Sequence, residues 1–213
     1  VALQHLNRLE NVPSELPGDV PTTIEFGNYY ALVIGNDEYQ GLPKLQTAVH
    51  GATVVADILE NQYGFTVTLI KNGTRADILK TLAGYRLQLN SRDNLLIYYA
   101  GHGVIDPDTK EGYWQPIGSN ETDYWDWIQN SDITVQLKAF KARHVLVVAD
   151  SCYSGTLFRG SELEKVGRKG DGWIEKMVKK PSRTALTSGT FLEPVLDGGG
   201  AGHSVFTKYL IQV

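Results

Sequence analysis

Short, largely apolar runs alternate with helical hydrophobic repeats along most of the chain. The apolar runs are bounded by glycine or polar residues, a pattern that predicts strands buried on both faces. Between them, apolar residues recur at intervals of three and four, which predicts amphipathic helices. The predicted strands cover residues 30–34, 65–70, 95–100, 145–149 and 183–187, and the predicted helices cover residues 45–59, 74–89, 131–140 and 205–211.

Polar residues mark the starts of two of these helices. Thr74, followed three residues later by Asp77, is typical of a helix start, and Ser131 or Asp132 can cap the helix before the fourth strand. Strands alternating with helices of this size predict an α/β fold with a mostly parallel central sheet and helices on both faces.

The length and composition predict one domain. The chain has 213 residues, 42% of them hydrophobic, which is enough for one sizeable core. Residues 1–27 combine a leucine-spaced piece with prolines and a glycine, which predicts an N-terminal extension or linker, and the domain is expected over residues 28–213. The chain starts without methionine and stops inside an apolar stretch, so we expect an excerpt of a longer protein with other domains as partners.

The charge, the apolar runs and the cysteine count argue against a nucleic-acid partner, a membrane helix and an internal disulfide. The formal charge is −4 and no basic run is longer than Lys179-Lys180, so nucleic acid is not an expected partner. No apolar stretch approaches the roughly 20 residues that a membrane helix needs. A single cysteine cannot form an internal disulfide. We therefore expect a cytoplasmic protein without a membrane partner.

A histidine and the single cysteine follow two of the predicted strands. His102 lies between glycines after residues 95–100, and Cys152 follows residues 145–149. Parallel strands bring their carboxyl ends to one edge, and an imidazole there can take the proton of a thiol. The pair therefore predicts a cysteine hydrolase. Each residue alone also fits a plainer interpretation, a turn for the histidine and a small buried thiol for the cysteine.

The residues around this pair resemble a known family. The stretches Tyr98–Gly103 and Asp150–Gly155 are similar to motifs of the caspase-like peptidases, peptidase family C14, in the metacaspase and bacterial orthocaspase branch. The animal-caspase signature is not met, because Asp150 stands where that signature has glutamine. The resemblance covers about residues 28–212. It implies a caspase–hemoglobinase fold and a cysteine endopeptidase acting on proteins or peptides.

The resemblance also implies roles for individual residues. Cys152 corresponds to the nucleophile and His102 to the general base, which together form a dyad without a third orienting residue. The backbone N–H groups of Gly103 and Cys152 correspond to the oxyanion hole.

Asp150 is the main candidate for substrate specificity. A carboxylate two positions before the nucleophile can pair with arginine or lysine, as the resemblance to metacaspases implies; the alternative is a helix-cap or turn aspartate. Metacaspases usually add a second acid where this chain has Gly51. The pocket is then expected to be either less acidic or completed by another group such as Asp37, and Ser188 is a further candidate substrate-binding residue.

Acidic residues follow His102 in the loop that binds calcium in some metacaspases. Asp106, Asp108 and Glu111 could supply oxygen ligands, but acidic turn residues are mostly just solvated. We expect no metal ligands and no cofactor, with calcium as the alternative.

Residues 156–182 are rich in glycine and basic residues. By position they match the segment that separates the large and small parts of the caspase-like fold and is often self-cleaved; a plain surface loop is the alternative. The tryptophans could line a peptide groove or simply pack; they are Trp114, Trp125, Trp127 and Trp173.

Two other functions compete with a peptidase. A catalytically silent signalling or interaction module could use the same fold, although the intact Cys152 and His102 argue against it. A flavodoxin-like or receiver-like domain shares the alternating pattern, but no phosphate-binding glycine loop follows the first strand.

Overall fold

The computed structural model describes residues 27–152, 179–189, 198 and 202–212. The chain divides into two units, one of residues 27–162 and 181–213 and the other of residues 1–26 and 163–180, and the fold below belongs to the first. The predicted N-terminal extension, apart from Gly27, and most of the predicted cleavage segment lie outside the described residues.

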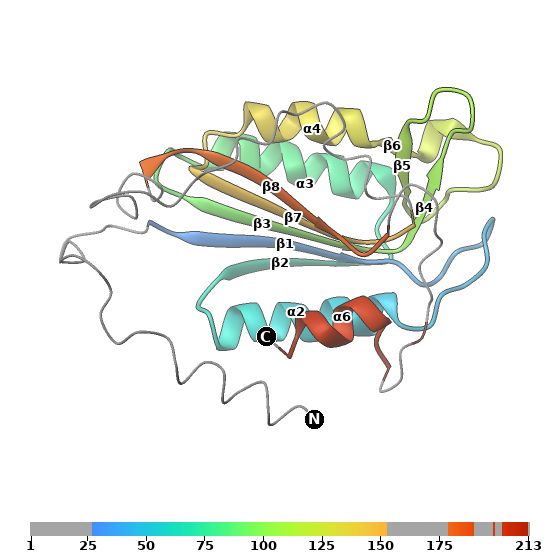
Figure 1. The fold of residues 1–213 in the computed structure, drawn as a ribbon, viewed down its shortest axis with the longest axis horizontal. Helices are drawn as coiled ribbons and strands as arrows, with labels where there is room; N and C mark the ends of the chain where they lie inside the picture. Colours follow the sequence, from blue (N-terminus) through green and yellow to red (C-terminus); the bar gives the residue numbers. More distant parts are fainter. Residues whose placement is uncertain (1–26, 153–178, 190–197, 199–201, 213) are drawn as a thin grey trace, which may run out of the picture. The chain divides into compact units, whose positions relative to one another are not determined.

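A five-stranded parallel sheet forms the centre of this unit (Figure 1). Its order is β2-β1-β3-β7-β8, and the strands are β1 (Tyr29–Gly35), β2 (Thr66–Lys71), β3 (Asn94–Ala100), β7 (His144–Asp150) and β8 (Ser182–Thr187). The central strands β1, β3 and β7 are almost wholly buried, whereas the edge strand β2 is only partly covered. The predicted parallel α/β sheet is therefore confirmed.

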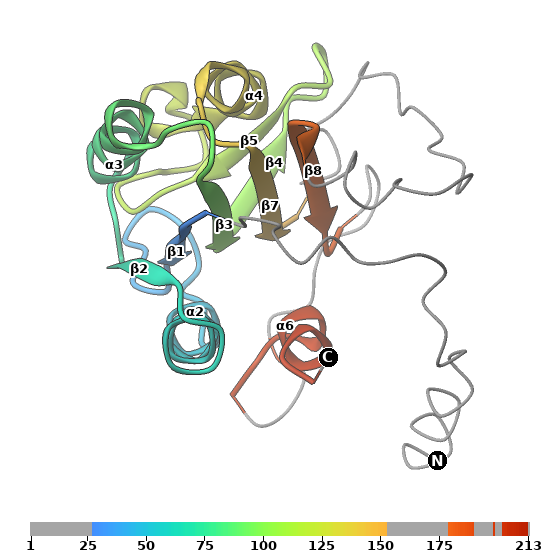
Figure 2. The same cartoon turned by 90° about the vertical axis from the view of Figure 1, so that its left-hand side faces the viewer.

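Two layers of helices enclose the sheet (Figure 2). The helices are α2 (Ala48–Asn61), α3 (Arg75–Gln88), α4 (Asn130–Ala139) and α6 (Val205–Leu210). Side chains of α3 and α4 pack in one apolar cluster on one face of the sheet, and those of α2 and α6 pack in a second cluster on the other. Helices on both faces, as predicted, are thus confirmed. No helix in the described ranges has the length and apolar character needed to cross a bilayer.

Hydrogen bonds from backbone N–H groups to polar side chains explain where two helices begin. The predicted capping box of α3 is present, because Thr74 and Asp77 each accept a hydrogen bond from the other's backbone N–H. Helix α2 begins at Ala48, three residues later than predicted. The Asp37 carboxylate, distant in sequence, accepts hydrogen bonds from the N–H groups of Ala48 and Val49 at 3.0 and 3.1 Å. A long-range cap of this kind leaves no signal in the hydrophobic repeat.

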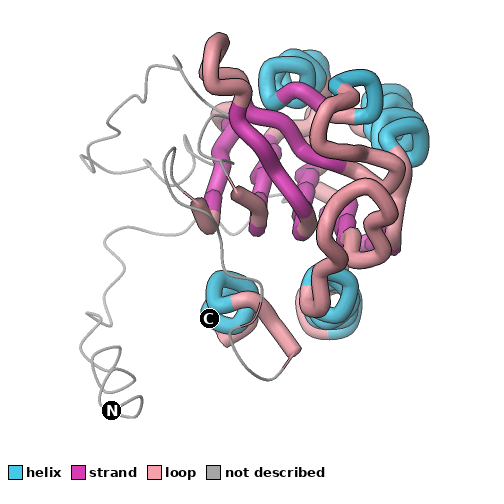
Figure 3. Tube along the Cα trace, turned by 90° about the vertical axis from the view of Figure 1, so that its right-hand side faces the viewer, coloured by secondary structure: helices cyan, strands magenta, loops and turns pink. Residues whose placement is uncertain are grey.

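A small antiparallel sheet follows β3 where a loop was expected (Figure 3). It has the order β4-β5-β6, and its strands are β4 (His102–Ile105), β5 (Gly112–Gln115) and β6 (Ile128–Gln129). The turn between β4 and β5 is held by Asp106, whose carboxylate accepts hydrogen bonds from the N–H groups of Asp108 and Thr109. Strands this short show too few alternations for a sequence pattern to predict them. A single 3-10 turn, η1 (Tyr124–Asp126), precedes β6.

Arg183 in β8 ties the edge of the parallel sheet to the end of α4. Its guanidinium donates to the carbonyl oxygens of Leu137 at 2.7 Å and of Phe140 and Ala142 at 2.9 Å. These carbonyls lie at the C-terminus of α4 and in the segment that leads into β7. Because a helix end leaves carbonyls without intrahelical partners, a cation placed there stabilises it.

Replacing Arg183 by methionine should lower the free energy of unfolding by about 2 kcal/mol, because hydrogen bonds from a charged donor to several carbonyls are lost. The measurement is a urea unfolding curve. Arg86→Met is the matched control, since Arg86 is exposed in the last turn of α3. Equal stability of the two variants would contradict this account of Arg183.

Candidate functional site

The pairing of β3 with β7 brings the two main candidate residues together. Ala100 pairs with Asp150 as the last residue pair of the two strands, and the Gly101 N–H lies 3.5 Å from the Asp150 carbonyl oxygen. His102 and Cys152 each follow two residues after this pair. The two side chains therefore lie at the same edge of the sheet, as the strand pattern predicts.

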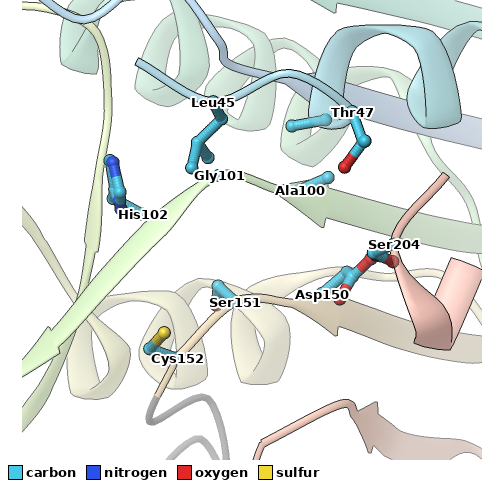
Figure 4. Close-up of a pocket in the computed structure, with 10 residues that line it drawn as sticks. Leu45, Thr47, Ala100, Gly101, His102, Asp150, Ser151, Cys152 and Ser204 are labelled. Atoms are coloured by element: carbon cyan, nitrogen blue, oxygen red, sulfur yellow. Dashed lines mark hydrogen bonds between the residues drawn. The ribbon is translucent and has the colours of Figure 1, made fainter. Parts of the chain in front are cut away.

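A pocket of about 110 Å³ opens at this edge (Figure 4). His102 and Cys152 border it from β4 and from the end of β7, and Asp150 lies deeper, next to Ser204. The segment before α2 and the first turn of that helix form the opposite wall. The complete lining is Leu45, Thr47, Ala48, Ala100, Gly101, His102, Asp150, Ser151, Cys152 and Ser204.

The glycines on both sides of His102 are required by close contacts within the protein. A Cβ atom on Gly101 would lie 2.7 Å from the Tyr39 hydroxyl and 2.8 Å from the Tyr99 hydroxyl. A Cβ atom on Gly103 would lie 2.3 Å from the carbonyl oxygen of Cys152. Gly103 thus lets β4 run directly against the residue that carries the thiol.

The imidazole of His102 has a backbone partner that the sequence did not reveal. Its Nε2 lies 2.7 Å from the carbonyl oxygen of Pro43. A carbonyl can only accept a hydrogen bond, so Nε2 carries the proton and Nδ1 of the neutral ring is the basic nitrogen. Pro43 therefore supplies the orienting group that the expected dyad lacked. A backbone oxygen has no side-chain signature by which it could have been found.

Asp150 is held at the base of the pocket by hydroxyl groups of the α6 segment. It is 7% exposed, and its Oδ2 accepts hydrogen bonds from the hydroxyls of Ser204 and, at 2.7 Å, Thr207. Since the Thr207 proton goes to Asp150, the Tyr98 hydroxyl 2.5 Å away donates to Thr207. Burial, and then the Asp150 charge, raise the pKa of Tyr98, which keeps this donor protonated.

The second oxygen of the Asp150 carboxylate accepts no such hydrogen bonds from the described residues. Oδ1 is buried and has no hydrogen-bond partner among the described residues. A buried carboxylate oxygen without a donor costs free energy, and a cationic group entering the pocket could supply that donor.

The other sequence-predicted residues lie in different places. Ser188 continues the pairing of β8 with β7, where its N–H donates to the Ala149 carbonyl at 3.0 Å, so it lies one strand from Asp150 at the same edge. Asp37 is not among the residues that line the pocket, and its carboxylate contacts the start of α2. Gly51 packs against Thr207, whose methyl group would lie 3.3 Å from an added Cβ.

The acidic residues after His102 also have structural contacts. Asp106 organises its own turn, and hydrogen bonds from the N–H groups of Thr109 and Asp108 lower the pKa of its carboxyl group. Glu111 accepts a hydrogen bond at 2.8 Å from the N–H of Ser131, in the first turn of α4. The described part of the chain contains no group of three or more His, Cys, Asp or Glu side chains that could hold a metal ion.

Three of the four tryptophans can be placed. Trp114 is buried and stacks on Tyr99, with ring centres 4.2 Å apart, and Trp127 is buried beside Tyr113. Trp125, in the 3-10 turn η1 before β6, is 85% exposed. Trp173 lies outside the described residues.

Two histidines lie next to the α6 segment. The rings of His50 and His203 stack with centres 4.8 Å apart, and His203 directly precedes Ser204, the partner of Asp150. Burial, and to a smaller extent the neighbouring His50, lower the pKa of His203 below its ordinary value of 6.5.

Comparisons with known proteins agree with this fold. The sequence model of peptidase family C14, described as the caspase domain, matches residues 28–213. The fold is similar to the crystal structure of protein GSU0716 from Geobacter sulfurreducens, with a TM-score of 0.62 and 21% sequence identity over 87% of this chain and 81% of that chain. No curated protein matches this chain.

The protein is therefore an α/β protein with a caspase-like fold. The chain belongs to the caspase-domain family of cysteine peptidases, peptidase family C14, over residues 28–213.

The lowered pKa of His203 predicts a pH dependence of stability. Because the unfolded chain binds a proton at His203 more readily than the folded chain does, folding stability is lost as the pH falls below about 6.5. Urea unfolding between pH 7.5 and pH 5 measures this loss. A His203→Gln variant should lose less stability over that range, and an equal loss in both proteins would contradict the assignment.

Proposed function

We propose that this protein is a cysteine endopeptidase that cleaves after arginine or lysine, with Cys152 as nucleophile and His102 as general base. The single observation that carries the proposal is one pocket bordered by His102, Cys152 and the buried carboxylate of Asp150. The similarity of this chain to metacaspases and bacterial orthocaspases, noted from its motifs, points to the same specificity.

The first half of the proposed reaction forms an acyl-enzyme. Nδ1 of His102 accepts the thiol proton of Cys152, while Nε2–H remains bonded to the Pro43 carbonyl. The thiolate attacks the carbonyl carbon of the scissile bond, and the resulting oxyanion receives hydrogen bonds from the N–H groups of Gly103 and Cys152. The C–N bond then breaks, and His102 gives its proton to the leaving amine, which leaves a thioester on Cys152.

The second half releases the acid product. His102 accepts a proton from water, and the hydroxide attacks the thioester carbon. The C–S bond breaks, and the thiolate of Cys152 recovers the proton from His102 as the carboxylic acid leaves. Self-cleavage within residues 156–182 would follow the same steps, because that segment carries the basic residues this specificity requires.

Asp150 supports the preference for a basic residue before the scissile bond. Ser204 and Thr207 fix one oxygen of its carboxylate, and the other oxygen is free of protein partners among the described residues. An arginine or lysine side chain in the pocket would donate to that oxygen, whereas a substrate aspartate would meet a like charge.

Removing either reacting group tests the chemistry. Cys152→Ala and His102→Ala should each lower kcat/KM by roughly 10³-fold or more, and the double variant should lose little further activity, because the two groups act as one unit. His144→Ala, at the opposite end of β7, is the matched control and should keep its activity. Cleavage by Cys152→Ala protein would overturn the proposal, and lack of activity in the wild type would favour a silent interaction module.

Removing the pocket charge tests the specificity. Asp150→Asn keeps the shape of the side chain, and it should reduce the preference for arginine over an uncharged residue by roughly 10- to 150-fold, which corresponds to about 1.5–3 kcal/mol for a charge-assisted pair. Fluorogenic peptides that differ only at this position measure the preference. Asp57→Asn, an exposed position on α2, is the control for net charge. Equal turnover of aspartyl and arginyl peptides by the wild type would reject the assignment.

A further inference from the structure

Both backbone groups of His102 are bound by buried tyrosine hydroxyls. The His102 N–H donates to the Tyr39 hydroxyl at 3.0 Å, and the Tyr99 hydroxyl donates to the His102 carbonyl at 2.8 Å. The chain leaves the parallel sheet at this point and enters β4. The two tyrosines thus bind both the N–H and the carbonyl group of His102, at the point where the chain passes from the parallel to the antiparallel sheet.

The two hydroxyls also share a partner. Tyr39 donates to the carbonyl oxygen of Gln115 at 2.8 Å, and the Tyr99 hydroxyl lies 3.1 Å from the same oxygen. Gln115 is the residue of β5 that pairs with His102. Any side chain on Gly101 would displace both hydroxyls, because its Cβ atom would lie only 2.7 and 2.8 Å from them. The contacts therefore form one compact unit.

The segment that carries Tyr39 also contacts the imidazole itself. The Tyr39 ring lies against the His102 ring, with centres 4.7 Å apart, and four residues later Pro43 accepts from Nε2. Tyr39 is 1% exposed, and Tyr99 is fully buried and stacked on Trp114. Neither ring can turn away without disrupting the core, so the orientation of His102 is set before any substrate arrives.

We propose that Tyr39 and Tyr99 are positioning residues that fix His102 with Nδ1 available to Cys152. This inference rests on the proposed peptidase function, because it assigns the hydroxyls a role in the pairing of thiol and imidazole. A general base contributes fully only when it is held at the correct distance and angle, and a displacement of about 1 Å can cost roughly 100-fold in rate.

Both hydroxyls keep their protons over the working pH range. Burial raises the pKa of Tyr39 to about 12 and raises that of Tyr99 well above its ordinary value. The two tyrosine hydroxyls therefore remain available as hydrogen-bond donors throughout that range.

The experiment compares Tyr39→Phe and Tyr99→Phe with Tyr85→Phe. Tyr85 is a matched control, because its buried hydroxyl also donates to a backbone carbonyl, that of Ala31 at 3.1 Å, but on α3 outside the pocket. Two quantities are measured, namely kcat and KM on an arginyl peptide, and the rate at which iodoacetamide alkylates the only cysteine as a function of pH. Both the kinetic constants and the alkylation rate are corrected for the folded fraction, which is measured by urea unfolding. A loss of stability alone therefore changes neither quantity.

We expect each clamp variant, Tyr39→Phe or Tyr99→Phe, to lower kcat by roughly 10- to 100-fold with KM changed less than threefold. Alkylation of Cys152 should also shift toward higher pH, because the thiolate loses its imidazolium partner. Tyr85→Phe should match the wild type in both measurements. Clamp variants that behave like Tyr85→Phe would overturn the inference. The alkylation profile does not require peptide cleavage, so a failure of the proposed peptidase function remains distinguishable from a failure of the clamp.

Discussion

The parallel pairing of β3 with β7 is the constraint on which the site depends. Its register sets Ala100 opposite Asp150, and the residues that follow these two strands are then carried to one edge of the sheet. A shift of the register by one residue would reverse the faces to which all side chains of a strand point. Because both strands are buried on both faces between two helical layers, such a shift would also disrupt both apolar clusters.

Contacts across that edge of the sheet form the walls of the pocket. Gly103 allows β4 to run against Cys152, and Pro43 fixes the protonated nitrogen of His102. Ser204, the N-cap residue of α6, and Thr207 within that helix hold one oxygen of the Asp150 carboxylate, and the other oxygen is buried without a hydrogen-bond partner among the described residues. His102 and Asp150 are therefore positioned by different segments of the chain. His102 depends on β3, β4 and the loop before α2, whereas Asp150 depends on β7 and α6, and Cys152 lies two residues after the end of β7.

The sequence predicted the parts of this arrangement that strand patterns report. The apolar runs before Gly101 and Asp150 indicated adjacent buried strands, and the motifs around His102 and Cys152 indicated the caspase-domain family, which the family match confirms. The capping box of α3 was likewise visible, because both of its residues lie within one turn.

The contacts that the sequence did not predict are long-range or made by the backbone. The carbonyl of Pro43 and the hydroxyl of Tyr39 reach His102 from about 60 positions away, 59 and 63 in sequence. Asp37 is an acidic candidate for the pocket, yet its carboxylate accepts hydrogen bonds from N–H groups in the first turn of α2, eleven and twelve residues later. The close contacts that require glycine on both sides of His102 are also long-range, because they involve the hydroxyl groups of Tyr39 and Tyr99 and the carbonyl oxygen of Cys152.

The most direct test of the account is covalent labelling of Cys152 by a peptide acyloxymethyl ketone, followed by mass spectrometry of the intact protein. This probe needs a nucleophilic thiol, an imidazole partner and a fitting side chain at the same time. We predict one adduct, on Cys152, from an arginyl probe, little labelling by the matching aspartyl probe, and little labelling by either probe in the His102→Ala protein. Equal labelling by the two probes, or undiminished labelling of the His102→Ala protein, would contradict a shared site for His102, Cys152 and Asp150.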